Sequence, residues 1–273
     1  ACAKPPNFCT SSTTQGTIAA RLEIPSPASA GPDRSKKIMA KQHTIQLARM
    51  LQSQGFGSRK YCRQLIESGR VSVNGSEQTD PQLELSCQNL QFSVDGAPWQ
   101  YREQIYLLLH KPGDYECSRN PQHYPSVLSL LPQPLQERGV QCVGRLDADT
   151  TGLLLLTDDG PWLHQLTHPK HHVPKRYLIT LKHPYNEAQL QALRDGVLLH
   201  GETEPCRAQD LQVRGERLLA MTIDQGKYHQ VKRMLAAAGN RVEALHREQF
   251  GRLTLAGLAP GEWCYLDETQ RQL

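Results

Sequence analysis

The first helical pattern of apolar residues lies in the segment L-A-R-M-L, residues 47–51, which predicts a short helix. Gly55-Phe56-Gly57 breaks this helix, and Ser58 is a residue type that caps the start of the next one. The second helix is predicted over residues 59–68, with Gly69 as its C-terminal stop. Two short helices therefore follow one another along the chain.

A hairpin pattern follows the second helix directly. Polar and apolar residues alternate in Val71-Ser72-Val73, and Asn74-Gly75 is a dipeptide typical of a two-residue hairpin turn. The two helices and this hairpin predict one compact N-terminal domain over residues 41–100.

A second domain is predicted over residues 104–273, where strand and helix patterns alternate irregularly. The predicted strands cover residues 105–110, 153–157, 176–181 and 218–223. The predicted helices cover residues 125–130, 186–195 and 229–238. The sequence lacks both the glycine-rich dinucleotide fingerprint and a regular strand–helix–strand repeat. We therefore predict an α+β fold with a mixed, mainly antiparallel sheet in this domain.

Residues 1–40 show neither helical nor strand periodicity. They contain five prolines among many serines and threonines, which predicts a disordered tail. The first methionine is Met39, and we hypothesise that translation begins there. Mass spectrometry of the endogenous protein tests this, since peptides from before Met39 would contradict it.

Composition excludes several classes of protein. With 38% hydrophobic and 21% charged residues, the chain has enough apolar side chains to build a core. No uninterrupted apolar run approaches the roughly 18 residues of a membrane helix, so an integral membrane protein is excluded. The eight cysteines are scattered singly, without the paired spacing of a zinc site. This pattern predicts reduced thiols, no bound metal and a cytoplasmic location.

Charge is unevenly distributed along the chain, although the net charge is only +4. Residues 41–75 contain six Lys or Arg and one acidic residue, and residues 225–252 contain six against two. The segment 76–100 carries four acidic residues and no basic one. Basic blocks of this kind are typical of proteins that contact a nucleic-acid backbone. Arg59, Arg63 and Arg70 recur at near-helical spacing opposite the apolar side, which predicts one basic stripe suited to a phosphate backbone. Merely solvated helix faces are the alternative interpretation.

The densest group of chemically reactive residue types is G-R-L-D-A-D-T-T-G-L-L-L-L-T-D-D-G, residues 144–160. It places Asp147 and Asp149 just before an apolar strand, where a catalytic acid can be held in a fixed position. The D-x-D-x-T pattern of aspartyl-phosphate phosphatases also fits, but Gly144-Arg145-Leu146 replaces the apolar strand that should precede it. Carboxylates that only cap turns are a further alternative.

Two other motif matches lack an essential feature. H-Q-L-T-H, residues 164–168, has glutamine where a zinc metalloprotease requires its general-base glutamate. His171 and His172 adjoin it, but neighbouring residues on an extended chain point to opposite faces and make a poor metal pair. G-F-G-S-R-K, residues 55–60, lacks the spacing of a phosphate-binding loop. The sequence therefore gives no support for metal-dependent or nucleotide hydrolysis.

Four segments together carry a resemblance to a known family. Residues 47–75 resemble the S4 RNA-binding domain, and residues 144–160 closely resemble the active-site motif of pseudouridine synthases. The segments P-K-R-Y-L-I-T-L, residues 174–181, and G-K-Y-H-Q-V-K-R-M, residues 226–234, complete the match, which spans residues 45–268. The chain resembles a pseudouridine synthase with an appended S4 domain, and most closely the branch that acts on small-subunit (16S) ribosomal RNA.

The resemblance implies roles for particular residues. Asp147 is the expected catalytic aspartate, Tyr177 the ring that stacks on the target base, and Lys232 the basic partner of the aspartate. Lys232 stands where many relatives have arginine, and an ammonium lacks the bidentate geometry of a guanidinium. Arg145 is expected to reach the flipped nucleotide or its phosphate. Further RNA contacts are expected from Arg59, Lys60, Arg63, Arg70, Lys175, Lys227, His229, Gln230 and Arg233.

The implied reaction isomerises uridine to pseudouridine: the glycosidic bond breaks, the uracil turns, and C1′ is rejoined to C5. Because this isomerisation is redox-neutral, we expect no cofactor. The expected partner is ribosomal RNA or a small-subunit assembly intermediate, and we expect a monomer without membrane contact. Three alternatives stay open: a synthase for large-subunit (23S) RNA, a non-catalytic S4-type assembly factor that binds ribosomal RNA, and a two-carboxylate glycosidase.

Overall fold

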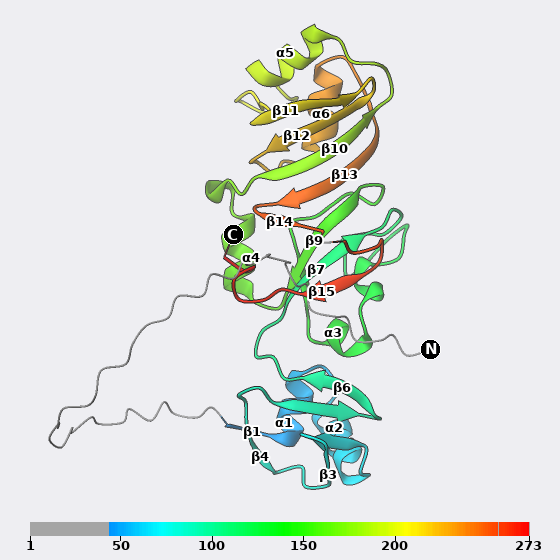
Figure 1. The fold of residues 1–273 in the computed structure, drawn as a ribbon, viewed down its shortest axis with the longest axis vertical. Coiled ribbons are helices and arrows are strands. Elements are labelled where there is room, and N and C mark those ends of the chain that lie inside the picture. The colour runs from blue at the N-terminus through cyan, green and yellow to red at the C-terminus, as the bar shows by residue number, and fades with distance from the viewer. Residues whose placement is uncertain (1–43, 256, 273) are drawn as a thin grey trace, which may run out of the picture.

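Two units are stacked along the long axis of the molecule (Figure 1). The computed structural model describes residues 44–255 and 257–272. The N-terminal unit comprises residues 44–101 and the C-terminal unit comprises the described residues from 105 onward. The tail expected over residues 1–40 and the hypothetical start at Met39 lie outside the described residues.

The N-terminal unit packs two helices and a four-stranded antiparallel sheet around one core. The helices are α1 (Leu47–Ser53) and α2 (Arg59–Glu67). The sheet has the order β3-β2-β5-β6, with β2 (Val71–Val73), β3 (Ser76–Gln78), β5 (Gln91–Val94) and β6 (Ala97–Gln100). A separate antiparallel pair joins β1 (Thr44–Gln46) to β4 (Glu84–Ser86). This arrangement contains the two helices and the hairpin that the sequence predicts.

Local signals fix the ends of these elements. The Ser58 side chain accepts a hydrogen bond from the backbone N–H of Tyr61 and caps α2. Asn74 and Gly75 both have positive φ, as the tight turn between β2 and β3 requires. The apolar side of α2 is buried against the sheet, whereas its basic residues are exposed.

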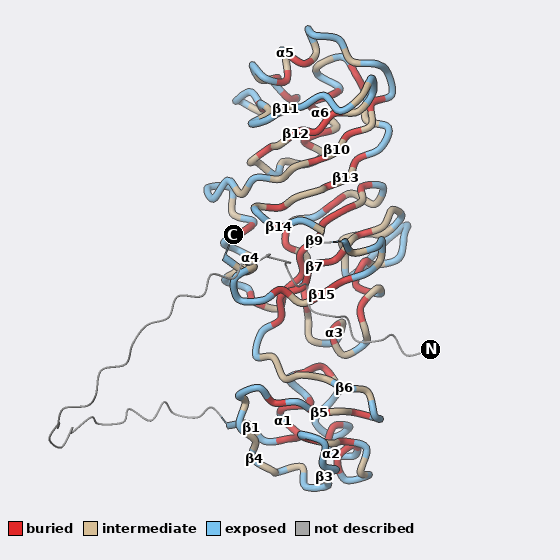
Figure 2. Tube along the Cα trace, viewed as in Figure 1, coloured by how far each residue is buried: buried red, intermediate tan, exposed pale blue. Residues whose placement is uncertain are grey.

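The C-terminal unit is built on a nine-stranded mixed sheet. Seven strands follow the order β11-β12-β10-β13-β9-β7-β15, and β8 and β14 pair at its side. Their bounds are β7 (Tyr106–Lys111), β8 (Gln141–Val143), β9 (Thr151–Thr157), β10 (Lys175–Leu181), β11 (Asp210–Gly215), β12 (Leu218–Ile223), β13 (Val242–Phe250), β14 (Leu253–Thr254) and β15 (Trp263–Tyr265). Among the described strands of this sheet, only β9 and β13 pair in parallel, so the predicted mainly antiparallel sheet is confirmed. Strands β7 and β9 are buried almost throughout (Figure 2).

Helices cover this sheet and its connections. They are α3 (Gln133–Glu137), α4 (Gly160–Thr167), α5 (Glu187–Asp195) and α6 (Gln230–Ala237), with 3₁₀ turns η1 (Val127–Leu130) and η2 (Pro169–His171). Side chains of α5 and α6 share a core with β10 and β12, so both helices pack on the same sheet face. Within the described ranges, none of the helices is long and apolar enough to cross a membrane.

Two local expectations were wrong. The helix predicted over residues 125–130 is only the 3₁₀ turn η1, because Ser126 is extended and caps a segment that starts at Val127. The predicted extended chain at His171 and His172 is also absent: His171 ends η2, and His172 adopts a left-handed conformation with φ 48°. Pro125 lies just before η1, and Pro169 is the first residue of η2, which favours short turns over longer regular elements.

One arginine joins the two units. The Arg138 side chain is only 4% exposed and forms an ion pair with Asp158 at 2.6 Å. It also donates hydrogen bonds to Gln54 Oε1 at 2.9 Å and to the carbonyl oxygen of Arg102 at 2.8 Å. A single buried guanidinium therefore contacts the N-terminal unit, the linker and the C-terminal unit.

Candidate active site

A buried lysine holds the loop that carries the two aspartates. Lys111, at the end of β7, is completely buried, and its Nζ donates to the carbonyl oxygens of Pro112, Ala148 and Thr150 at 2.8–2.9 Å. Burial lowers the pKa of Lys111, and nearby acidic groups partly oppose this effect. Three carbonyl acceptors around one ammonium fix the backbone on both sides of Asp149.

Asp147 lies between two side chains from the start of α6. Lys232 Nζ is 2.9 Å from Asp147 Oδ2, and His229 Nε2 is 3.1 Å from Oδ1. The Asp147 side chain is 30% exposed, so it is reachable from solvent without lying on an open surface. The structure thus brings together the aspartate and lysine that the sequence pairs by resemblance.

Lys232 also binds the second aspartate. Its Nζ lies 2.7 Å from Asp149 Oδ1 and 2.9 Å from Oδ2, although the Asp149 side chain is 71% exposed. Burial acts to raise the pKa of Asp149, but the hydrogen bond and the charge of Lys232, together with hydrogen bonds from Thr150 and the backbone, hold the pKa below its ordinary value. Burial acts to lower the pKa of Lys232, but its bonds to Asp149 and Asp147 raise the pKa overall. The lysine is therefore a stable cation between two carboxylates.

The turn before α6 presents an aromatic pair beside this cluster. His229 has φ 46°, a left-handed conformation that turns the chain into the helix. The Tyr228 ring stacks on the His229 ring with centroids 3.8 Å apart and an interplanar angle of 19°. Tyr228 is 71% exposed. An exposed aromatic ring thus adjoins the imidazole that contacts Asp147.

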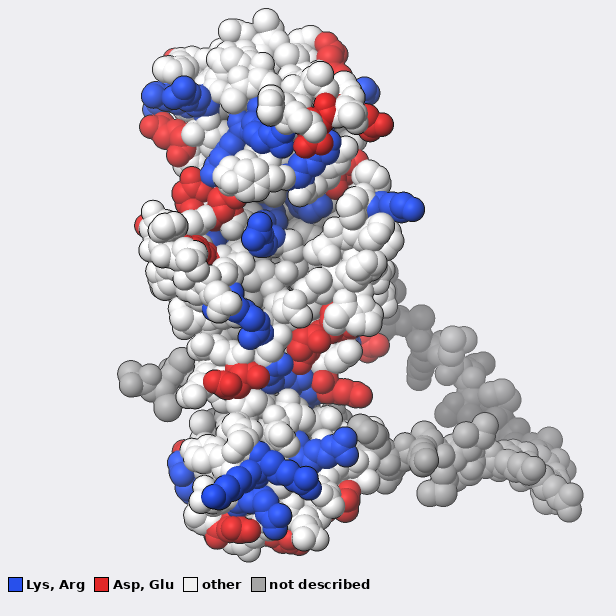
Figure 3. Space-filling model, turned by 180° about the vertical axis from the view of Figure 1, so that it is seen from behind, with Lys and Arg blue, Asp and Glu red and all other residues white. Residues whose placement is uncertain are grey.

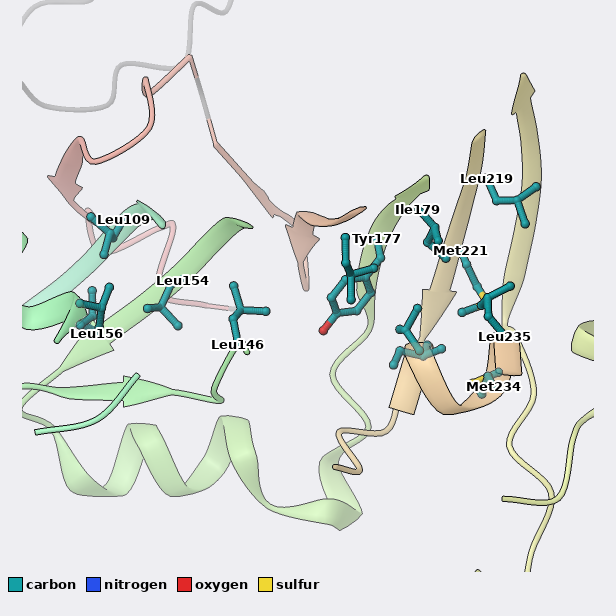
Figure 4. Close-up of a cluster of buried hydrophobic side chains, with 14 of the residues drawn as sticks. Leu109, Leu146, Leu154, Leu156, Tyr177, Ile179, Leu219, Met221, Met234 and Leu235 are labelled. Atoms are coloured by element: carbon teal, nitrogen blue, oxygen red, sulfur yellow. The ribbon is translucent and has the colours of Figure 1, made fainter. Parts of the chain in front are cut away.

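Asp147 and Lys232 border a pocket of about 120 Å³ between the two halves of the sheet. Its apolar walls come from Leu146, Ile223, Val231 and Leu245. Its polar lining comprises Arg145, Asp147, Thr150, Lys175, Tyr177, Lys227, His229, Gln230, Lys232 and Arg247. Figure 4 shows the Tyr177 ring between the leucines of the β7–β9 half and the apolar side chains of the β10–β12 half. An aromatic ring beside an aspartate suits the binding of a flat base.

Three residues on one face of the sheet form the inner wall of this pocket. Tyr177 on β10 pairs directly with Arg247 on β13, and Lys175 lies two residues before Tyr177 on the same face. Burial, followed by the charge of Arg247, lowers the pKa of Lys175 to about 8, although Asp224 opposes this effect. The wall combines an aromatic ring with two cations.

Gly152 permits the close approach of strands β9 and β13 at the pocket. These strands pair over only two positions, and Gly152 stands opposite Arg247. Gly152 has φ 110°, and a Cβ there would lie 2.3 Å from the carbonyl oxygen of Arg247. Only glycine fits such a contact without displacement of the backbone.

Most of the residues expected at the catalytic site line this one pocket, but Arg233 does not. Arg233 points away and contacts Glu202 at 3.3 Å together with the carbonyl oxygens of Tyr228 and His200. Gln230 is 4% exposed, and its Oε1 accepts a hydrogen bond from the Lys227 backbone N–H at 3.0 Å. Arg233 and Gln230 therefore hold the turn before α6 rather than present donors to solvent.

The basic residues of the N-terminal unit lie elsewhere, on the exposed side of α2. Figure 3 shows lysine and arginine side chains gathered on one face of this unit. Arg59, Lys60 and Arg63 are exposed there, but Arg70 is not part of the helix, because α2 ends at Glu67. Arg70 instead donates two hydrogen bonds to the Asp95 carboxylate, each at 2.6 Å. The stripe predicted from the spacing of arginines is correct for α2 and wrong for Arg70.

Two buried cations and the strand β13, which lines one side of the pocket, were missed in the sequence analysis. Lys111 was not singled out, and Arg247 counted only as one residue of the basic block 225–252, yet Lys111 holds the loop and Arg247 lines the pocket. Leu245 was not singled out, and β13 was not predicted as a strand. A signal was available in the sequence. Arg247 lies two residues after the apolar Leu245, so in a strand both side chains point to the same face.

The reactive residues do not form a metal site. Among residues 44–255 and 257–272, no group of three or more His, Cys, Asp or Glu side chains is arranged to hold a metal ion. The carboxylates Asp158 and Asp159 are engaged structurally: Asp158 pairs with Arg138, and Asp159 caps α4 by accepting from the Trp162 N–H. Asp147 and Asp149 remain as the carboxylates beside the pocket.

Comparison with known proteins agrees with this arrangement. The model for RNA pseudouridylate synthase matches residues 105–237, and the model for the S4 domain matches residues 47–86. The chain is 40% identical over 222 residues to the ribosomal small subunit pseudouridine synthase A of Yersinia pestis, covering 80% of this chain and 93% of that protein. It is also 40% identical over 215 residues to the protein of the same name from Escherichia coli strain K12, covering 78% and 92%.

The fold agrees with a solved relative. A crystal structure of a pseudouridylate synthase superposes on 84% of this chain and 98% of that chain, with a TM-score of 0.59 and 35% sequence identity. The order of an S4 unit followed by a mixed-sheet unit is therefore that of a known architecture. By sequence, fold and arrangement of the pocket, this chain belongs to the RNA pseudouridylate synthase family and carries an S4 domain.

Proposed function

We propose that this protein isomerises a specific uridine of 16S ribosomal RNA to pseudouridine. The observation that carries the proposal is the position of Asp147, held by Lys232 at 2.9 Å beside a pocket walled by Tyr177. The names of its relatives from Yersinia pestis and Escherichia coli support the small ribosomal subunit as the source of the substrate.

The pocket supplies what the isomerisation demands. The target base must leave its stack, which costs a few kcal/mol, and stacking on the Tyr177 ring offsets part of that cost. Asp147 must be ionised to act as a nucleophile or a base, and the ammonium of Lys232 stabilises that form. The N1–C1′ bond breaks, a C5–C1′ bond forms, and the proton on C5 is replaced by one on N1, so the reaction needs no oxidant or reductant.

In this proposal, basic side chains outside the pocket contact the phosphate backbone of the RNA. Arg145 is exposed beside the pocket, and α2 exposes Arg59, Lys60 and Arg63 on the other unit. Phosphate contacts of this kind give affinity without reading sequence. We further propose that the protein acts as a cytoplasmic monomer on ribosomal RNA or an assembly intermediate, with domains over residues 41–100 and 104–273.

The proposal is tested by incubating wild-type protein and the variant Asp147→Asn with 16S and 23S ribosomal RNA transcripts. Pseudouridine is then mapped at nucleotide resolution. The wild-type protein should modify one position in 16S RNA. Asp147→Asn should lower the rate at least about 100-fold, yet bind RNA with similar affinity because the fold and the basic surfaces are unchanged.

Other outcomes redirect or overturn the assignment. Product in 23S RNA alone would identify a large-subunit enzyme. RNA binding without product in either RNA, together with unchanged pseudouridine in cells that lack the gene, would identify a non-catalytic assembly factor. A near-normal rate for Asp147→Asn would remove Asp147 from its catalytic role.

A further inference from the structure

Arg247 is a buried cation that lines the catalytic pocket, and one of its donors has no acceptor among the described residues. Its side chain is 1% exposed and lines the pocket. Its Nε donates to the carbonyl oxygen of Leu153 at 2.7 Å, whereas Nη2 is buried and has no hydrogen-bond partner among the described residues. A buried guanidinium N–H without an acceptor is costly, so its presence in a pocket indicates that a ligand supplies the acceptor.

The neighbours of Arg247 favour an electron-rich ligand atom. Lys175 lies on the same wall, and its Nζ donates to the carbonyl oxygens of Val173 and Asp224 at 2.8 and 3.3 Å rather than to a carboxylate. The Asp147 carboxylate is already held by Lys232 and His229. The inner wall therefore carries positive charge that the protein's own carboxylates leave largely uncompensated.

We propose that Arg247 donates a hydrogen bond from Nη2 to the carbonyl oxygen at the inner edge of the target uracil, O4 in the uridine and O2 in the pseudouridine. This inference rests on the proposed function and adds a substrate-contacting residue to it. It makes Arg247 a determinant of specificity for uracil.

The orientation of the base follows from the positions of Asp147 and Arg247. Asp147 is 30% exposed and Arg247 is 1% exposed, so the glycosidic bond lies at the Asp147 end and the far edge of the base lies deepest. In uracil, C4 is directly across the ring from N1. The deepest exocyclic atom of a uridine bound in this way is O4.

The same donor remains satisfied after the base has turned. Rotation of uracil by half a turn about the axis through N3 and C6 exchanges N1 with C5 and exchanges C4=O with C2=O. When C5 reaches C1′, O2 therefore occupies the former place of O4. One fixed N–H from Arg247 can hold the base before and after rotation, whereas contacts to N1 or C5 must change.

The contact also explains selection of uracil over cytosine. Cytosine carries an amino group on C4, so a guanidinium donor would meet another donor and both would remain unpaired. In any route where the N1–C1′ bonding electrons stay on the base, negative charge spreads onto both carbonyl oxygens. A buried cation at one of them then stabilises that state.

The test combines an atomic change in the RNA with a change in the protein. Substrate RNA with uridine or 4-thiouridine at the target carries tritium at C5, and release of tritium measures turnover in both. Sulfur accepts hydrogen bonds weakly, so wild-type kcat/KM should fall about 10-fold on 4-thiouridine. Arg247→Met should lower kcat/KM on uridine about 10- to 100-fold. Its kcat/KM should differ little between the two RNAs, because the effects of two changes at one direct contact are not additive.

Control variants separate this contact from a structural role. The thio effect is the ratio of kcat/KM on uridine to kcat/KM on 4-thiouridine. Arg247→Lys retains the charge without the forked donor and should show an intermediate thio effect. Arg217→Met removes an exposed arginine that pairs with Glu243 at 3.5 Å, outside the pocket, and should keep the full thio effect. Thermal unfolding of the two Arg247 variants measures the stability lost with the hydrogen bond to Leu153.

Three results overturn the inference independently of the proposed function. These are equal wild-type rates on uridine and 4-thiouridine, an unchanged thio effect in Arg247→Met, or an unchanged thio effect in Arg247→Lys if Arg247→Met does not fold. Failure of the proposed function gives a different result, because wild-type protein would then release no tritium from either RNA.

Discussion

Two short helices, α2 and α6, carry similar basic residues in opposite electrostatic settings. On α2, Arg59, Lys60 and Arg63 are exposed, and among the described residues only Arg63 has an acidic partner, Glu67 at 3.9 Å. At the start of α6, every lysine or arginine is paired. Lys227 and Arg233 contact Glu202 at 2.8 and 3.3 Å, and Lys232 contacts Asp147 and Asp149 at 2.9 and 2.7 Å.

The difference shows that equal charge can serve unequal purposes. Unpaired, solvated cations can neutralise phosphates and release counterions, which gives affinity that depends on salt. Cations already engaged by carboxylates add less to such binding, but they fix acidic groups in position. We infer that α2 contributes affinity and that α6 contributes chemistry.

The largest effect that this comparison predicts comes from loss of the cation on α6. Lys232→Gln removes the ammonium that holds Asp147 and Asp149, so kcat/KM should fall about 100-fold, the usual cost of losing one preorganised charge contact. RNA affinity, measured by filter binding, should change little. Lys232→Arg is the matched control and should retain much of the activity, because its guanidinium can reach the same carboxylates. A loss confined to RNA affinity would contradict the division of roles.

Neutralising α2 should have a smaller effect of the opposite kind. The triple variant Arg59→Gln, Lys60→Gln, Arg63→Gln should bind RNA about 10-fold more weakly at moderate salt and lose roughly 0.7–0.9 units of salt slope for each phosphate contact removed. The catalytic rate at saturating RNA should be unchanged. Arg70→Gln is an informative control, since Arg70 is already paired with Asp95 and should matter less. An unchanged salt slope in the triple variant would mean that α2 is only a solvated face.

Elements with strong local signals were predictable from the sequence. Strand β12 covers Leu218–Ile223 as expected, and α5 starts directly after Asn186, whose side chain forms a capping box with Gln189. Strand β13 was not predicted, because its nine residues mix polar and apolar types at both exposed and buried positions. Its identity as a strand depends on pairing with β10, which no local pattern encodes.

The candidate site divides in the same way. Asp147, Tyr177 and Lys232 were identified because each belongs to a recognisable segment. Lys111 and Arg247 act on segments 37 to 94 residues away in the chain, and their buried contacts are to backbone carbonyls, which leave no trace in side-chain spacing. Arg70 shows the converse error: a regular spacing of arginines suggested one stripe, but the helix ends before it.

The smallest predicted effect concerns Lys175, which is half-buried and whose Nζ, within the described ranges, donates to backbone carbonyl oxygens rather than to a carboxylate. Its pKa of about 8, against an ordinary 10.5, means that from pH 8 upward the unfolded chain binds more protons than the folded one. The free energy of unfolding should therefore rise with pH between about 8 and 10.5, because deprotonation of Lys175 removes the cost of burying its charge. RNA affinity should fall about two- to threefold between about pH 7 and about pH 9, because a cation beside the pocket is lost. Binding curves at several pH values check this: the pH dependence should persist in the α2 triple variant and disappear in Lys175→Met, and its persistence in Lys175→Met would assign it to another group.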